Sequence, residues 1–170
     1  MSGFRTIPAL VVALLMAVGS AHPVQQSHSA TFEGTIRGKP TRQLVLPAPD
    51  RPNHILGLVE TEGSYEPAKD SEFLKGATVR TIETWDFVDG SGSDRGYMTF
   101  AIGKSTLVAT YSGNVKPAEN AQSTISGSMR FETGTGEFSG IKGSAQYTGL
   151  AGSQSFELRI NGEFQERTDQ

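Results

Sequence analysis

The sequence predicts an all-β protein whose strands form an antiparallel sandwich or barrel. Apolar and polar residues alternate strictly along segments such as 124–132 and 156–164, a pattern typical of strands with one buried and one wet face. Strand-like segments recur every ~10 to 15 residues with no helices between them, which favours a sandwich or barrel. The third observation is a glycine-rich segment, 133–147, in which glycines surround the apolar residues Phe138 and Ile141. Apolar anchors between glycines predict a tight, structured connection between strands.

The N-terminus has the pattern of a secretory signal peptide over residues 1–21. Arg5 supplies a positive charge, residues 7–18 are almost purely apolar, and small residues precede the expected cleavage after Ala21. The apolar run is shorter than the ~20 residues that a membrane-spanning helix needs. Residues 22–30 are polar and are expected to form a flexible extension, and residues 31–166 to form a single domain.

The remaining elements follow from alternation and from turn residues. The strand-like segments are, in order, 31–37, 54–65, 78–88, 97–102, 106–111, 124–132 and 156–164. Four prolines in 39–52 predict an irregular loop or an edge segment, and 67–75 is the only plausible helical turn. The dipeptides at 89–90 and 103–104 predict turns, and 114–122 is expected to be a polar loop.

Composition excludes several classes of function. The chain has 170 residues, a formal net charge of −3 and no cysteine. The absence of cysteine excludes thiol catalysis, disulfide exchange and cysteine-ligated zinc, and it fits a bacterial periplasmic or extracellular protein. The mild acidity argues against nucleic acid or an anionic membrane as a partner.

The second half of the chain, roughly 84–164, resembles the allene oxide cyclase and dirigent-like barrels. Those families carry a GGxGxFxGxxG turn between late strands, and the sequence TGTGEFSGIKG stands in that pattern. The matching positions are Gly134, Gly136, Phe138, Gly140 and Gly143. The resemblance implies a secreted bacterial-type member, folded over 31–166 as a single eight-stranded antiparallel β-barrel with an apolar cavity. It also implies that these five residues form a structural turn and do not touch a substrate.

The first half departs from the plant allene oxide cyclases. Those enzymes place a Glu and an Asn on the first strand, with a Ser-Pro nearby, and segment 30–50 offers no residues that align with them. No catalytic position is therefore carried over from the family. The candidates for a site come from the residues of this chain alone.

Glu83 is the candidate catalytic residue. It shares its alternation parity with Val79, Thr81, Trp85 and Phe87, and therefore its side of the sheet. If that side is internal, the carboxylate enters the cavity beside the only tryptophan, where burial raises its pKa and suits it to acid or base catalysis. The alternative places Glu83 on the wet face, which is the default for glutamate.

Three aromatic residues are candidate ligand-binding groups, namely Trp85, Tyr97 and Tyr111. Tyrosine offers a cavity wall a flat apolar ring with a hydrogen-bonding tip. Tyr147 has the same character, and packing in the core is the alternative role for each tyrosine.

Neither a metal nor a cofactor is expected. The histidines have no metal-ligand spacing, and His54 is expected to be a surface or strand-end residue. Asp86, Asp89 and Asp94 surround a glycine turn, which suggests either a calcium loop or a hairpin loop whose side chains bond their own backbone. Their spacing does not match a twelve-residue calcium loop, so the hairpin loop is favoured.

Three functions fit these observations. The resemblance implies a secreted or periplasmic soluble barrel that cyclises or orients a reactive hydrophobic small molecule, as an isomerase if it is an enzyme at all. The first alternative is a non-catalytic binder of a small hydrophobic ligand. The second is an outer-membrane β-barrel, which the polar end of the chain and the few runs of 9–11 residues disfavour. The expected partner is a small hydrophobic molecule, with no membrane after removal of the signal peptide; a homo-oligomer is compatible with the family.

Overall fold

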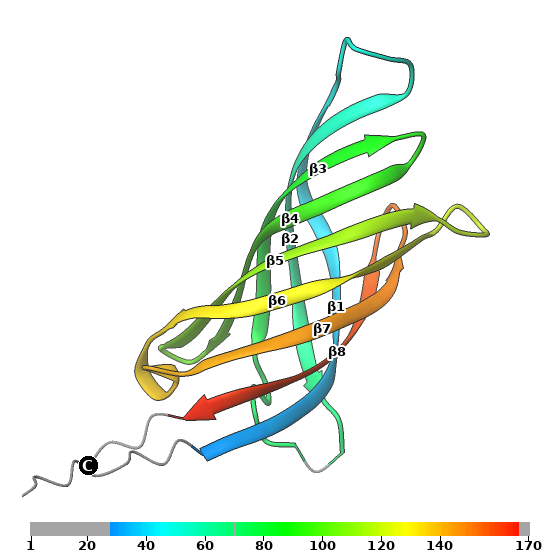
Figure 1. Ribbon diagram of the computed structural model, residues 1–170. Coiled ribbons are helices and arrows are strands. Elements are labelled where there is room, and N and C mark those ends of the chain that lie inside the picture. Colours follow the sequence, from blue (N-terminus) through cyan, green and yellow to red (C-terminus); the bar gives the residue numbers. More distant parts are fainter. Residues whose placement is uncertain (1–27, 70, 167–170) are drawn as a thin grey trace, which may run out of the picture.

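The structure is a closed barrel of eight antiparallel strands that follow one another in chain order (Figure 1). It is a computed structural model that describes residues 28–69 and 71–166. The strands are β1 (His28–Pro47), β2 (His54–Pro67), β3 (Thr78–Val88), β4 (Ser91–Ile102), β5 (Ser105–Pro117), β6 (Ser123–Gly134), β7 (Lys142–Ala151) and β8 (Phe156–Glu166). The prediction of an eight-stranded antiparallel barrel is confirmed, and the sandwich is excluded. The expected signal peptide, 1–21, lies outside the described residues.

Strand β1 is much longer than predicted because it pairs on both sides. Its first half pairs with β8, from His28 to Gly38, and its second half pairs with β2, from Gly34 to Pro47. The prediction of an irregular loop over 39–52 is therefore wrong for residues 39–47. A register shift just after Pro40 accommodates the missing backbone donor there. The strand also takes in residues 28–30 of the expected extension; residues 22–27 are outside the described part of the chain.

The described residues of the segment 67–75 do not form a helical turn. Leu74 and Gly76 have φ angles of 59° and 77°, which end any right-handed helix at this point. The loop instead folds under the barrel, where Leu74 is 1% exposed and the ring of Phe73 stacks on that of Phe164 at 3.9 Å. This loop closes one end of the barrel. Across the residues that the structure describes, no helix has the length and apolar character needed to cross a membrane.

The glycine-rich segment closes the same end. After β6 the chain makes a short 3₁₀ turn, η1 (Gly136–Phe138), which directs Phe138 and Ile141 into the interior, each 5% exposed. Gly136 and Gly140 adopt φ angles of 59° and 80°, a region that favours glycine. At Gly134 and Gly143 a Cβ would overlap a backbone carbonyl oxygen of another residue. Residues 135–141 thus form a structural turn, whereas residues 142–147, which the sequence placed in the same connection, already belong to β7.

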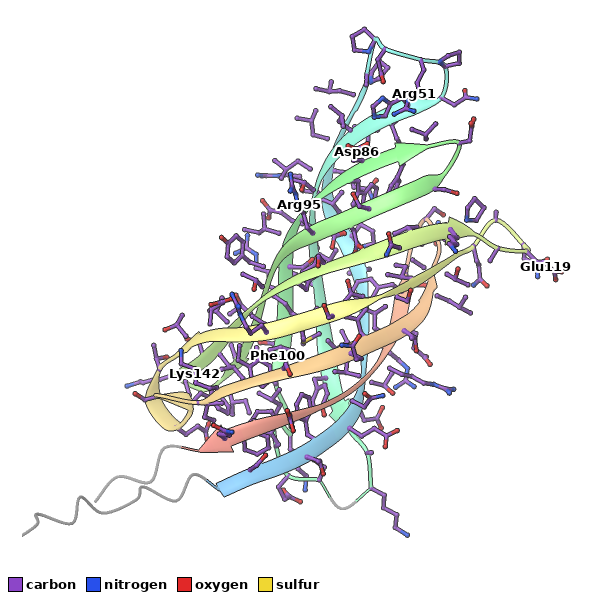
Figure 2. The ribbon with its side chains drawn as sticks, viewed as in Figure 1. Arg51, Asp86, Arg95, Phe100, Glu119 and Lys142 are labelled. Atoms are coloured by element: carbon purple, nitrogen blue, oxygen red, sulfur yellow. The ribbon has the colours of Figure 1, made fainter. Side chains whose placement is uncertain are left out.

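The interior of the barrel is divided into a filled half and a hollow half. Aromatic rings fill the half next to the β2–β3 loop and η1, where Phe32 lies near both Phe131 and Phe73. The opposite end carries the β1–β2, β3–β4, β5–β6 and β7–β8 connections. Arg51 and Glu119 mark two of these connections in Figure 2. The loop before β6 is short, because β5 extends to Pro117 and takes in much of the expected 114–122 loop.

Candidate functional site

A cavity of about 300 Å³ occupies the hollow half of the barrel. It extends to the β5–β6 and β7–β8 connections, which contribute Ala121, Gly152 and Ser153 to its rim. Each of the eight strands contributes to its wall, and most of the wall is apolar or aromatic. The strand residues that line it are Pro40, Gln43, Thr61, Thr81, Glu83, Trp85, Phe87, Asp94, Met98, Tyr111, Val115, Ser123, Ile125, Tyr147, Ala151, Phe156 and Leu158.

Glu83 points into this cavity from β3. Its Oε1 accepts a hydrogen bond of 2.9 Å from Trp85 Nε1, and its Oε2 accepts a short hydrogen bond from the Tyr111 hydroxyl. Burial raises the pKa of Glu83, and the two donated hydrogen bonds oppose that shift. Alternation parity put Glu83 on the same side as Thr81 and Trp85 and left two alternatives, and the structure has that side facing inward.

Asp94 is the second carboxylate in the cavity. It lies on β4 directly opposite Trp85, is only 5% exposed, and is a diagonal neighbour of Glu83 because Glu83 pairs with Gly96. Burial, and then the charge of Glu83, raises the pKa of Asp94 to about 6. Its Oδ1 is buried and has no hydrogen-bond partner among the described residues. A pKa near neutrality suits this group to exchange a proton with a bound molecule.

Tyr147, on β7, is a further polar residue of the cavity, beside Glu83, Asp94 and Tyr111. Its ring meets that of Tyr111 edge to face, with centroids 6.0 Å apart, and burial raises the pKa of both phenols, so both stay protonated. The Tyr147 hydroxyl is buried and, within the described part of the chain, makes no hydrogen bond. It lies over Gly113 and Gly127, which face each other on β5 and β6, and a Cβ on either glycine would overlap it.

Asp94 and Tyr147 share the space over Gly113. A Cβ at this glycine would also overlap Asp94 Oδ1, at 2.6 Å. The two unpartnered polar atoms are therefore close neighbours in a recess that exists because position 113 has no side chain. We call Glu83, Asp94, Tyr111 and Tyr147 the polar cluster.

The remaining walls are aromatic and aliphatic. The rings of Trp85 and Phe87 stack with centroids 5.3 Å apart and planes 15° apart. Two buried hydroxyls, of Thr61 and Thr81, satisfy each other at 2.7 Å. These groups line the cavity around the polar cluster.

The prediction that Tyr97 lines the cavity is wrong. Tyr97 is 60% exposed on the outer face of β4, because it follows Gly96 and precedes Met98, whose positions face inward. Arg95 shares that outer face (Figure 2). Trp85 and Tyr111 do lie in the cavity wall, as predicted.

The three aspartates near the 89–90 turn do not form one loop. Strand β4 already begins at Ser91, so only Asp89 lies at the turn, with a φ of 51°. Asp86 is on the outside, and Asp94 is inside the barrel. Sequence reasoning placed Asp94 in a loop and missed its role in the cavity; its shared parity with Met98 and Phe100 is the signal that could have found it. Among the described side chains, no group of three or more His, Asp or Glu is placed to hold a metal ion.

His54 lies at the start of β2, outside the cavity, as expected for a strand-end residue. Its Nδ1 contacts Asp50 and its Nε2 lies 2.9 Å from Asp86 Oδ1, so the ring links the β1–β2 loop to β3. The contact with Asp50, and then that with Asp86, raises the pKa of His54. The side chain is 10% exposed.

Comparison with solved structures finds barrels of the same fold. The chain is similar to the pterocarpan synthase dirigent protein GePTS1, with a TM-score of 0.50 and 14% identity over 91% of this chain and 98% of that one. It is similar to the pterocarpan synthase dirigent protein PsPTS1, with a TM-score of 0.50 and 15% identity over 85% of this chain and 99% of that one. No family model and no curated protein matches the sequence. These likenesses show a dirigent-like barrel fold.

Proposed function

We propose that this barrel binds a small hydrophobic molecule in its cavity and directs its ring closure or orientation by acid–base chemistry at the polar cluster. The observation that carries the proposal is that two carboxylates, Glu83 and Asp94, face one apolar cavity with different hydrogen-bond surroundings. The volume of about 300 Å³ is at the lower end of the range typical of small-molecule sites. We also propose export of the protein, on the pattern of residues 1–21.

The two carboxylates suit different roles because their surroundings differ. Glu83 accepts hydrogen bonds from Trp85 and Tyr111, which favour its ionised form. Among the described residues, no hydrogen-bond donor contacts Asp94 Oδ1. The pKa of Asp94, about 6, lets this carboxyl take up or release a proton near neutral pH. Pairs of titratable groups with divergent environments are typical of acid–base sites. Asp94 is therefore the proton-exchanging group, and Glu83 is a hydrogen-bonded carboxyl beside it.

The shape of the cavity supports a directing role. A rigid apolar wall holds a flexible or reactive molecule in one conformation, which favours one intramolecular reaction over others. The two similar barrels are named pterocarpan synthase dirigent proteins, which supports a synthetic or directing role for a cavity in this fold. The apolar lining also argues against the alternative of an outer-membrane barrel, because the lumen of those barrels is polar.

A non-catalytic binder is the second candidate, and one observation favours it. Both oxygens of Glu83 already accept hydrogen bonds from the protein, as expected of a group that is fixed for recognition. Both candidates require a ligand in the cavity. They differ in whether Asp94 exchanges a proton with that ligand. The pH dependence of a proton-transfer rate distinguishes them.

Binding in the cavity can be tested with a neutral fluorescent probe, N-phenylnaphthylamine. Its emission is expected to rise on binding the protein, and Ile125→Trp, which fills the cavity, should weaken binding at least about tenfold, equivalent to about 1.4 kcal/mol. Ile82→Trp is the matched control, because Ile82 is 46% exposed on the outer face. Equal loss in both variants, or no binding to the unmodified protein, would contradict the proposal.

A further inference from the structure

We propose that the molecule bound in the cavity is an organic cation, an alkyl- or arylalkylammonium compound whose charged nitrogen lies against Asp94 and Glu83. This inference rests on the proposed function and adds the chemical class of its ligand. It depends on the charges of the cavity wall, on two unpartnered polar atoms, and on the aromatic rings around them.

The charge in the wall is all of one sign. The residues that line the cavity include two carboxylates and no lysine, arginine or histidine. Arg80 and Arg95, the arginines nearest in sequence to Glu83 and Asp94, are exposed on the outer face, where Arg80 bonds Glu60 at 2.9 Å. A cation supplied by the ligand would balance a charge that the lining residues leave unbalanced.

Asp94 and Tyr147 provide an independent sign of a ligand. Both side chains are more than nine-tenths buried and line the cavity, with exposures of 5% and 2%. Asp94 Oδ1 and the Tyr147 hydroxyl nevertheless have no hydrogen-bond partner within the described chain. A buried polar atom without a partner is costly, and a ligand N–H would satisfy the carboxylate oxygen. Both atoms lie in the recess over Gly113, which a side chain there would fill.

Aromatic faces around the carboxylates add to the attraction. Trp85, Phe87, Tyr111, Tyr147 and Phe156 all belong to the wall. An ammonium group over such rings is attracted by their negative faces, most strongly over tryptophan. Trp85 lies directly opposite Asp94 across the β3–β4 pair, so one nitrogen can approach the ring and the carboxylate together.

Other ligand charges fit the cavity less well. An anion would meet two carboxylates in an apolar environment, where like charges repel strongly. A neutral apolar ligand would leave Asp94 Oδ1 without a donor. A hydrophobic ammonium compound satisfies the carboxylate and fills the apolar wall at the same time.

Three probes of equal chain length test the inference, namely phenylbutylamine, phenylbutanol and phenylbutyrate. Their affinities at neutral pH are measured by calorimetry and by the emission of Trp85, the only tryptophan of the chain. The amine should bind at least about tenfold more tightly than the alcohol, because a hydrogen bond to a charged group is stronger than a neutral one. The butyrate should bind most weakly.

The variants locate the effect. Asp94→Asn should reduce the preference for the amine over the alcohol to about twofold or less. Glu83→Gln should also reduce this preference, by a smaller amount. Glu62→Gln, an exposed position on β2, is the matched control and should keep the full preference. Equal binding of amine and alcohol, or a preference that both cavity variants leave unchanged, overturns the inference while the proposed function stands. If the protein binds neither the three probes nor N-phenylnaphthylamine, the proposed function fails as well.

Discussion

Trp85 donates its indole N–H to Oε1 of Glu83 at 2.9 Å, along the inner face of β3. The two residues are separated by one outward-facing position, so the pleat of the strand places them on the same side. The chain contains a single tryptophan, which makes this hydrogen bond directly observable in solution.

The emission of Trp85 should therefore change as Glu83 takes up a proton. Burial raises the pKa of Glu83, so the midpoint should lie above the usual value of 4.5. A fluorescence titration measures it, and Glu83→Gln should abolish this transition. A titration that is unchanged in Glu83→Gln would show that the indole does not report on this carboxylate.

Asp94 should destabilise the folded protein at neutral pH. Folding raises its pKa from 3.8 to about 6, so the folded state binds the proton more tightly and stability falls as pH rises between these values. Asp94→Asn should raise the free energy of unfolding by about 2 to 3 kcal/mol near neutral pH, and by little below the usual pKa. Denaturant titrations at several pH values measure the difference. Glu62→Gln should stay within about 0.5 kcal/mol of the unmodified protein, and an equal gain in both variants would contradict the argument.

Asp94 should also act as a base toward a small apolar probe, nitrobenzisoxazole. The carboxylate takes the proton from the ring carbon while the nitrogen–oxygen bond breaks, which gives a coloured cyanophenolate. The rate should rise with pH through a pKa of about 6, because only the ionised carboxylate accepts the proton. Asp94→Asn should lower the rate by about 100-fold, the low end of the contribution typical of a positioned base. A rate equal to that of buffer at every pH would favour the non-catalytic binder.

His54 should stabilise the protein in its protonated form. Its pKa is raised by Asp50 and Asp86, so the stabilisation is fully present below 6.5 and is lost as pH rises through the higher pKa of the folded state. The pKa of Asp50 is lowered by the same contact, so that contribution is present above 3.8 and is lost as pH falls. His54→Gln should lower the unfolding temperature at pH 6 more than at pH 9, as measured by thermal scans. A loss that is the same at both pH values would indicate that His54 stabilises the protein by packing alone. In a separate measurement by NMR, Asp86→Asn should lower the pKa of His54.

Gly140 in the glycine-rich turn should not tolerate alanine, whereas Gly152 on the β7–β8 connection should. Gly140 has a φ of 80°, where an L-residue is strained, so Gly140→Ala should cost about 1 to 2 kcal/mol of stability. Gly152→Ala is the control, because its Cβ would meet its nearest neighbour at an ordinary 3.8 Å. Chemical denaturation of both variants measures the difference. Equal effects would show that the conformation of Gly140 is not what requires glycine.

Local sequence patterns predicted seven of the eight strands at least in part, and one half of the site; β7 was not among them. The alternation over 78–88 placed Glu83 and Trp85 on one face, and the 89–90 dipeptide marked the β3–β4 turn. A strand repeats every two residues, so parity is a local property that the sequence carries by itself. The same parity applied one strand further would have placed Asp94 with Met98 and Phe100.

The sequence by itself determined which residues of each strand share a face; the tertiary structure decided which face is the interior and which strands meet there. Pairing with β2 lengthened β1 through a proline-rich segment, and pairing of β1 with β8 closed the barrel. The interior thus formed contains Asp94 and Tyr147 and leaves Tyr97 outside. The polar cluster unites residues from β3, β4, β5 and β7. Such a meeting depends on strand register and barrel closure, which arise from pairing between distant segments and leave no local pattern in the chain.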